Sequence, residues 1–447
     1  MAWSRTCYVL RKLSAGQSIR PPAGVMSRGR IHSLVRSGFR VGLVSVDQAL
    51  SSLSNFAASI IAAHSLPTES FGAFGIIFAT YMMAIYSVRA ITGEVILLIG
   101  AERARADGAT NLLVSAAAGL CIGALIFAAG CIVDGPLSAA FVVLAAGMAG
   151  LAVQDTIRYL GFASQRVHFA LIVDILWLVF MLAACWFFLT SDAESLTTVT
   201  GAWVGSGVAA ALVTLPFLKI GKPSASRVRN WLRDQKATML SLFVDRGIVS
   251  ATQQSVVYII AVTIGLEGNA AYRGAQIVIG PFSVIAMGFA TVMIPHFVKI
   301  WQREPAALLG QAARISILSG GSLLLLTQLV AGIPDGLGRA LLDQSWALGK
   351  PILRAMALIV PLQIANFAAL GALRAMGRVG MALWVRVIVT PLTLISVVTA
   401  AYLGDIGTVV WAQVVGAAVA SLLWWFVAWR AHLGHSETLE GAKESAG

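Results

Sequence analysis

The sequence predicts an all-α integral membrane protein with about twelve transmembrane helices in two six-helix lobes. Of its 447 residues, 58% are hydrophobic and only 12% are charged, whereas a soluble domain carries roughly 25% charged residues. Hydrocarbon forces backbone polar groups to pair internally, so the spanning elements are helices or a closed barrel. Long unbroken apolar runs, at residues 139–153 and 175–189, fit helices rather than alternating barrel strands. An ordinary soluble enzyme is therefore excluded.

Apolar stretches of about 20 residues, long enough to cross roughly 30 Å of hydrocarbon, locate the helices. In the first half we predict spans at residues 40–63, 72–98, 109–133, 137–160, 168–190 and 197–218. In the second half we predict spans at residues 238–264, 271–297, 309–333, 351–372, 381–403 and 406–430. The resulting parts are a basic N-terminal tail (1–39), a first lobe (40–219), a basic linker (220–237), a second lobe (238–430) and a C-terminal tail (431–447).

The charge pattern orients these helices. The net charge is +12, from 32 basic and 20 acidic residues, and Lys and Arg accumulate in alternate connections, as cytoplasmic loops do. Arg103 and Arg105 lie in the second loop and six basic residues lie in the sixth, whereas most odd-numbered loops carry none; the ninth, at 334–350, is mixed. We therefore expect both termini in the cytoplasm and the chain in the cytoplasmic (inner) membrane. The basic residues face lipid head groups, and no nucleic-acid partner is expected.

Motifs for catalysis and for metal binding are missing from the sequence. The four cysteines show no spacing typical of a metal site. There is no nucleophile with a neighbouring base and no GxxxxGK[ST] phosphate loop. We predict a protein that is not an enzyme and that uses no metal or cofactor. Transport is then driven by the substrate gradient, by ions or by a partner.

The two halves of the sequence repeat each other. A shift of 198 positions superposes Val46-Asp47 on Val244-Asp245, and a shift of 212 superposes Arg166-Val167 on Arg378-Val379. Equivalent helices are six apart, an even number, so both halves enter the membrane in the same sense. The sequence therefore predicts a parallel repeat about a pseudo-two-fold axis along the membrane normal.

Residues 46–98 resemble the first two helices of Wzx-type polysaccharide flippases, which belong to the multidrug/oligosaccharidyl-lipid/polysaccharide exporter superfamily. The shared features are the polar Asp47-Gln48 on the first helix, an L-x-x-E-x-F-G-x-F motif from Leu66 and an R-A-x-x-G-E motif from Arg89. The segment 154–159 is similar to actinobacterial-type members. The resemblance implies two lobes around a cavity that opens alternately to each side. It also implies a polyprenyl-diphosphate-linked glycan as substrate, cell-surface polysaccharide biosynthesis as the pathway, and glycosyltransferases or a glycan polymerase as partners.

Ionisable residues inside spans are candidates for the substrate site, because each costs about 3 kcal/mol on insertion scales. Guanidiniums match phosphate oxygens, so Arg89 and Arg246 are expected to bind a diphosphate, and Asp47 and Asp245 to pair with them when no substrate is bound. Polar side chains on the same helices are expected to bind sugar hydroxyls, and Arg273, near the outer end of its helix, either meets the leaving diphosphate or anchors the interface. The full substrate-binding set is Arg89, Arg246, Asp47, Asp245, Gln48, Asn55, Gln253 and Arg273.

A second set of intramembrane charges is interpreted as gating or ion-pair residues. Asp174 lies at a depth similar to that of Arg89, whereas Glu94, Asp155, Arg158 and Arg386 lie nearer the cytoplasmic interface. Side chains there reach toward water without a transport role. For the charges at similar depth, an ion pair that locks helices together is the alternative interpretation; they are Asp47, Arg89, Asp174, Asp245 and Arg246.

Three other functions were compared with the flippase. A cation-coupled multidrug exporter of the same superfamily would favour an acidic cavity, whereas the excess of intramembrane Arg favours an anionic substrate. A membrane-embedded glycosyltransferase or glycan polymerase usually needs a large external loop, and the longest odd-numbered loop spans only residues 334–350. The second loop, 100–108, does not match the G-x-x-x-D-R-x-G-R-R pattern of a major-facilitator transporter.

Overall fold

A computed structural model describes residues 52–189, 195–218 and 220–444. They belong to one compact unit, Val46–Gly447. All regular elements within those ranges are helices. Asp47 and Gln48 lie outside the described residues, so their predicted roles stay predictions.

The N-terminal lobe begins with a helix at residues 52–65. Its second span is built from α3 (Thr68–Val88), a π-helical turn η1 (Arg89–Gly93) and α4 (Glu94–Leu98) in direct succession. The remaining elements are α5 (Ala101–Ala106), α6 (Gly108–Gly130), α7 (Pro136–Ala163), α8 (His168–Leu189), α9 (Leu196–Thr214) and η2 (Leu215–Leu218).

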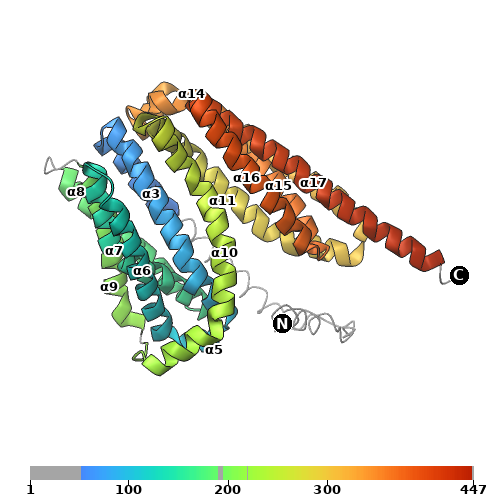
Figure 1. Ribbon diagram of the computed structural model, residues 1–447, viewed down its shortest axis with the longest axis horizontal. Helices are drawn as coiled ribbons and strands as arrows, with labels where there is room; N and C mark the ends of the chain where they lie inside the picture. Colours follow the sequence, from blue (N-terminus) through green and yellow to red (C-terminus); the bar gives the residue numbers. More distant parts are fainter. Residues whose placement is uncertain (1–51, 190–194, 219, 445–447) are drawn as a thin grey trace, which may run out of the picture. The chain divides into compact units, whose positions relative to one another are not determined.

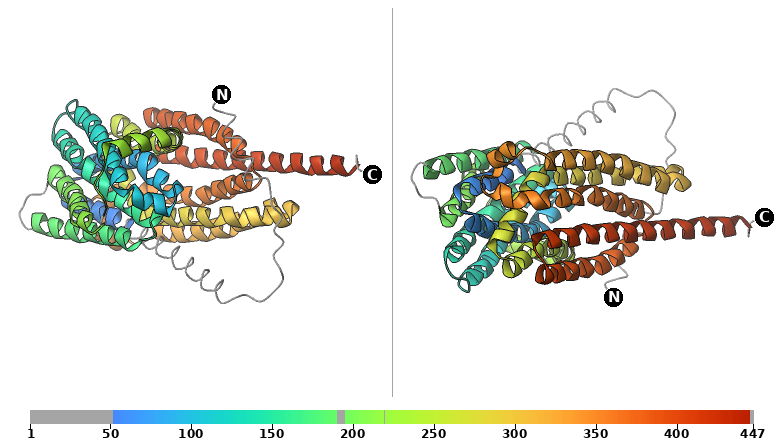
Figure 2. Two further views of the ribbon diagram at one scale, coloured as in Figure 1. Left: turned by 90° about the horizontal axis from the view of Figure 1, so that it is seen from below. Right: turned by 90° about the horizontal axis from the view of Figure 1, so that it is seen from above.

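The C-terminal lobe begins with α10 (Ala225–Thr263), which also contains most of the predicted linker. The elements that follow are α11 (Leu266–Arg303), η3 (Pro305–Ala307), α12 (Leu308–Ala331), α13 (Asp335–Leu342), α14 (Ser345–Ala357), α15 (Ile359–Ala375), α16 (Val379–Leu403) and α17 (Ile406–Glu444). In both views of Figure 2, α17 extends beyond the other helices of its lobe.

The predicted fold class is confirmed. Ten helices among the described residues are long and apolar enough to cross a membrane. The helix at 52–65 and α10 occupy the positions of the other two predicted spans, and together they complete two six-helix lobes. Several helices outrun the predicted spans, as α10 and α17 do, because backbone hydrogen bonding continues into water after the apolar segment has ended.

Glycines shape the helix ends and the packing inside each lobe. At the end of α10, Gly265 takes φ 101° and its N–H bonds back to the carbonyl of Ile260, a left-handed cap that L side chains disfavour. Gly123 lets α6 approach α7 closely, because a Cβ there would lie 2.7 Å from the Ala145 carbonyl oxygen. Small residues thus allow backbones to meet where the membrane supplies no hydrophobic drive.

The lobes contact each other through α3 on one side and α10 and α11 on the other. Where α3 and α11 begin, Asn269 Nδ2 donates to the carbonyl of Gly72 at 2.7 Å. Further along, the Thr80 and Tyr258 hydroxyls lie 2.7 Å apart. Figure 1 shows α3 and α11 adjacent at their starts and diverging toward their ends.

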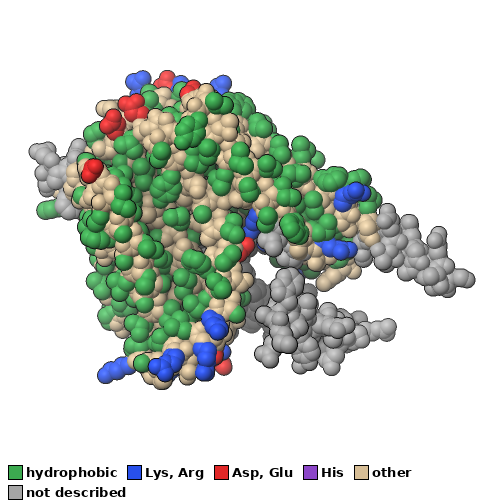
Figure 3. All heavy atoms as spheres, in the orientation of Figure 1, with side chains coloured by type: hydrophobic (Ala, Val, Ile, Leu, Met, Phe, Trp, Pro, Cys, Tyr) green, Lys and Arg blue, Asp and Glu red, His purple; other side chains and the backbone are tan. Residues whose placement is uncertain are grey.

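A second connection joins the start of α10 to the N-terminal lobe. Trp231 is only 2% exposed and packs with Val95 and Val114. Arg103 of α5 pairs with Asp234 at 3.2 Å. Lys and Arg side chains gather around α5 and the first turns of α10 (Figure 3). One continuous helix is therefore anchored on one lobe and forms the first span of the other.

Candidate functional site

A buried ion network lies inside the N-terminal lobe, and we call Arg89, Asp155, Arg158, Asp174 and Gln154 the N-lobe ion network. Arg89 donates to Asp155 from Nε at 2.9 Å and from Nη2 at 2.7 Å. Arg158 lies 3.2 Å from Asp155 Oδ1 and 3.1 Å from Asp174 Oδ2, and Gln154 donates to Asp174 Oδ1 at 2.9 Å. Two cations balance two anions, so the network is closed on itself.

The local backbone positions Arg89 for this network. The π-helical turn Arg89–Gly93 inserts an extra residue into the second span, as π-turns near functional sites often do. At its other end Gly93 packs on the Tyr159 ring, which a Cβ would approach to 2.8 Å. Thr92 and Ser115 extend the contacts through Thr156, whose hydroxyl lies 3.3 Å and 2.6 Å from theirs. The π-turn thus holds Arg89 against α7.

Burial of Asp155 and Arg158 differs from the expectation that they reach toward interfacial water. Their exposed fractions are 2% and 3%, and that of Asp174 is 0%. The α7 helix continues to Ala163 and is followed by Ser164, whose carbonyl accepts from Arg105 at 2.7 Å. Protein therefore covers Asp155 and Arg158, in a part of α7 where the length of the apolar run alone suggests the membrane–water interface.

A second group of charges joins the lobes, and we call it the inter-lobe arginine cluster: Arg246, Arg374 and Arg386 with Glu94 and Asp245. Arg246 Nε lies 2.7 Å from Glu94 Oε1, and Arg386 Nη1 lies 3.0 Å from Asp245 Oδ1. Arg374 interacts electrostatically with Arg386, Asp245 and Arg246. Three guanidiniums face two carboxylates, so the cluster carries an excess positive charge. Basic and acidic side chains reach the surface where the lobes meet (Figure 3).

Exposure separates the cluster from the buried network. The side chains of Arg246 and Asp245 are 48% and 49% exposed, and that of Arg386 is 29% exposed. Arg89 is 18% exposed and Asp155 only 2%. Diffusible ions therefore reach Arg246 and Arg386, whereas Arg89 already donates hydrogen bonds to Asp155 from both Nε and Nη2.

The pairing expected between Asp245 and Arg246 is not the one observed. Consecutive helical residues point about 100° apart, because a turn contains 3.6 residues. Asp245 therefore meets Arg386 on α16, while Arg246 meets Glu94 on α4. Each residue contacts a different lobe.

Arg273 lies between the lobes instead of at an exposed interface. Its Nη2 donates to the Ser59 hydroxyl at 2.8 Å, and its guanidinium lies 3.8 Å from the centre of the Phe78 ring. Asn55, one turn before Ser59, accepts the Ser59 hydroxyl at its backbone carbonyl. Gln253 is exposed on α10. The structure thus brings Arg273 to the N-terminal lobe, and among the described members of the predicted substrate set it places Arg89, Arg246 and Arg273 with different partners.

Sequence reasoning did not include two members of the inter-lobe arginine cluster in the candidate substrate site. Arg374 and Arg386 come from α15 and α16, far from the helices that carried the resemblance. For Arg386 the sequence did contain a signal: the shift of 212 positions that relates the two halves superposes it on Asp174, so both halves carry a charge at this position of the repeat. Within the described ranges, no three His, Cys, Asp or Glu residues are grouped as metal ligands would be.

Solved structures of membrane transporters share this two-lobe helical architecture. No protein-family model matches the sequence, and neither does any curated protein. An inward-facing multidrug resistance transporter of the MATE family, in the MOP superfamily, matches with 15% identity and a TM-score of 0.65, over 87% of this chain and 96% of its own. An outward-facing one matches with 16% identity and a TM-score of 0.58, over 88% and 94%.

A flippase has the same fold. The lipid II flippase MurJ, in its inward closed conformation, matches with 13% identity and a TM-score of 0.61, over 87% of this chain and 88% of its own. At these identities the likeness establishes the fold and not the substrate. The chain therefore has the fold of MOP-superfamily transporters.

Proposed function

We propose that this protein moves a polyprenyl-diphosphate-linked oligosaccharide across the cytoplasmic membrane by alternating access, for cell-surface polysaccharide biosynthesis. The observation that carries the proposal is the excess positive charge of the inter-lobe arginine cluster. Guanidinium forks bind phosphate oxygens through paired charge-assisted hydrogen bonds. An anionic head group is the substrate that such a cluster favours.

The existing ion pairs suit a site whose ligand comes and goes. Exposed ion pairs contribute about 0–1 kcal/mol, so a diphosphate can displace Asp245, whose side chain is 49% exposed, from Arg386 at little cost. Glu94 is only 19% exposed, so displacing it from Arg246 costs more. Breaking a buried pair costs about 3–5 kcal/mol. Arg246 and Arg386 are therefore assigned to the diphosphate, with Asp245 as the residue that substrate displaces. Arg89 can bind it only after its pair with Asp155 opens.

The other polar side chains receive later roles in the cycle. Gln253 and Asn55 are assigned to sugar hydroxyls and Arg273 to the diphosphate after the lobes have rearranged. Glu94 gates access to Arg246. The N-lobe ion network of Asp155, Arg158 and Asp174 keeps the first lobe rigid while the lobes move.

The charge distribution supports an orientation. The basic end with α5 and the start of α10 is assigned to the cytoplasm, because cytoplasmic loops are rich in Lys and Arg. The contact between α3 and α11 near Gly72 and Asn269 then lies at the outer end. The higher TM-score with the inward-facing transporter than with the outward-facing one supports the same assignment. The substrate enters from the cytoplasm, where glycosyltransferases of the pathway are the proposed partners.

A cation-coupled multidrug exporter is the second candidate function. The observation in its favour is the likeness to MATE multidrug transporters, which share the fold. Against it, both buried carboxylates of the N-lobe ion network already pair with arginine. A free cation would have to displace a guanidinium from Asp155 or Asp174.

Translocation in proteoliposomes tests the proposal. The substrate is a fluorescent polyprenyl-diphosphate oligosaccharide, and its movement is followed by quenching from outside. We expect the wild type to translocate it, Arg246→Gln and Arg386→Gln to be slower by about tenfold or more, and Arg227→Gln, at an exposed position in the start of α10, to match the wild type. Equal rates in all four proteins, or export of organic cations instead, would refute it.

A further inference from the structure

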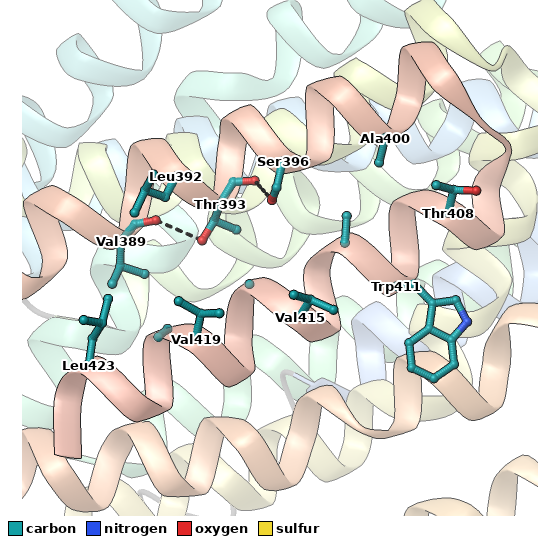
Figure 4. Close-up of a pocket in the computed structure, with 13 residues that line it drawn as sticks. Val389, Leu392, Thr393, Ser396, Ala400, Thr408, Trp411, Val415, Val419 and Leu423 are labelled. Atoms are coloured by element: carbon teal, nitrogen blue, oxygen red, sulfur yellow. Dashed lines mark hydrogen bonds between the residues drawn. The ribbon is translucent and has the colours of Figure 1, made fainter. Parts of the chain in front are cut away.

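An apolar groove runs along the outside of the C-terminal lobe between α16 and α17. Its volume is about 520 Å³, and Val389, Thr393 and Ser396 face Val415 and Val419 across it (Figure 4). The Thr393 hydroxyl donates to the Val389 carbonyl at 2.9 Å, and the Ser396 hydroxyl to the Thr393 carbonyl at 2.8 Å. Both hydroxyls are therefore satisfied within α16, and the groove offers a hydrocarbon surface.

The N-terminal lobe has an equivalent groove between α8 and α9, with a volume of about 580 Å³. The two grooves are lined at matching positions. On the last helix of each lobe, Gly201 and Gly205 line the N-terminal groove one turn apart, as Val415 and Val419 line the C-terminal one. On the preceding helix, Phe180 and Ala184 stand 212 positions before Leu392 and Ser396, which also line the C-terminal groove. The groove is thus a repeated feature of the fold.

The grooves differ in the charge at one end. Arg386 lies one turn before Val389, and the spacing 386, 389, 393, 396 places it on the groove-lining face of α16. Its side chain is 29% exposed and contacts the inter-lobe arginine cluster through Asp245. The equivalent position in the other lobe is Asp174, which is fully buried in the N-lobe ion network. Of these two grooves, the C-terminal one leads to an accessible guanidinium.

We propose that the α16–α17 groove binds the isoprenyl chain of a lipid diphosphate whose diphosphate is held by Arg386. The inference rests on the proposed function and adds the place of the lipid tail. In a bilayer an apolar chain gains no hydrophobic energy from leaving other chains, so packing alone selects weakly. The charge-assisted bonds to the diphosphate supply the selectivity. The α8–α9 groove, which lacks such a cation, is occupied by ordinary membrane lipids.

Photo-crosslinking tests the proposal with a matched control. Benzoylphenylalanine replaces Val419 in one protein and the equivalent Gly205 in another, where an added Cβ meets no atom within 4 Å. Both proteins are placed in phospholipid nanodiscs that contain a radiolabelled long-chain polyprenyl diphosphate. We expect labelling at Val419 to exceed labelling at Gly205 by about tenfold, and Arg386→Gln to remove that excess. Unlabelled polyprenyl diphosphate competes, and polyprenyl alcohol does not.

The other outcomes of these experiments separate the groove proposal from the proposed function. Equal labelling at both positions, insensitivity to Arg386→Gln, or equal competition by phosphatidylglycerol would make the groove a general lipid slot. A wild type that translocates the lipid-linked oligosaccharide without selective labelling at Val419 disproves the groove but not the function. Selective labelling without translocation supports the groove and disproves the function. A second pair of variants, Val419→Trp and Gly205→Trp, checks the result without a photoprobe, because only the first is expected to slow translocation.

Discussion

The charged residues of the N-lobe ion network and of the inter-lobe arginine cluster differ in burial. Arg89, Asp155, Arg158 and Asp174 are paired inside one lobe, whereas Arg246 and Arg386 are accessible where the lobes meet. A charge that stays buried and paired holds helices in place, because releasing it costs several kcal/mol. An accessible charge with a weak partner is free to exchange that partner for a ligand.

The buried pair of Arg89 and Asp155 is expected to contribute to the free energy of unfolding because its two charges balance. Arg89→Leu leaves two carboxylates for one guanidinium, and Asp155→Leu leaves the reverse, so each is expected to destabilise the protein by about 3 kcal/mol. The double variant keeps the pair of Arg158 with Asp174 and is expected to be more stable than either single variant. Unfolding free energies in detergent measure this coupling. Simple additivity of the two losses would contradict it.

The pair of Arg246 with Glu94 predicts opposite effects on ligand binding. Arg246→Gln removes a phosphate contact and is expected to weaken binding of a polyprenyl diphosphate by about tenfold. Glu94→Gln removes the competing carboxylate and is expected to strengthen it. Because Arg246 is 48% exposed and Glu94→Gln keeps the size of a side chain that is 19% exposed, neither change should alter stability by more than about 1 kcal/mol. Titration calorimetry at two salt concentrations measures both, and equal weakening in the two variants would show that the pair only braces the lobes.

At the scale of elements, α13 and α14 account for the mixed charges of the ninth loop. Asp335 accepts from Lys350 and from Trp346 Nε1, and these hydrogen bonds hold its pKa below the usual value. A lowered carboxyl pKa stabilises the fold above the unfolded pKa, about 3.9. The contribution is lost as the pH falls through the lower folded value. As the pH falls, protonation of Asp335 is therefore expected to change the fluorescence of Trp346, at a pH below the pKa of an ordinary Asp. The control is Asp335→Asn, in which this fluorescence change is expected to be absent.

The contact between α3 and α11 predicts a conformational effect. A Cβ at Gly72 would lie 1.9 Å from the Leu266 carbonyl oxygen, so Gly72→Leu must separate the two helix starts. Spin labels at Glu69 and Glu267, both exposed near these starts, report the distance by pulsed electron resonance. We expect the distance to increase in Gly72→Leu and to stay unchanged in Gly205→Leu, where an added Cβ meets no atom within 4 Å. An unchanged distance in both would show that the lobes are not closed through this contact.

Most of the helical architecture could be predicted from the sequence, and most of the charge pairing could not. Apolar length and alternate basic loops follow from the bilayer itself, so they predicted the number and the positions of the spans. The partner of Asp245 depends on the rotation of α10 and on the approach of α16, which no local pattern encodes. Glu94 was expected near the interface, yet the π-turn before it and the packing of α10 bring it to Arg246.

In the whole molecule, α10 connects the two lobes, because it packs on the N-terminal lobe and forms the first helix of the C-terminal one. Its start is held on the N-terminal lobe by Trp231, and its middle carries Asp245 and Arg246. A ligand that takes Arg246 from Glu94 therefore acts on the helix that links both lobes. This arrangement provides a physical route from head-group binding to lobe movement.

In the proposed function, the inter-lobe arginine cluster binds a lipid-linked diphosphate through its charge. The most direct measurement compares the binding of a polyprenyl diphosphate and of the matching polyprenyl alcohol to the purified protein, in the wild type and in the double variant Arg246→Gln and Arg386→Gln. We expect the wild type to bind the diphosphate about a hundredfold more tightly than the alcohol, as two charge-assisted contacts imply. We expect the double variant to lose this difference in affinity. Equal affinity of the wild type for both lipids would contradict it.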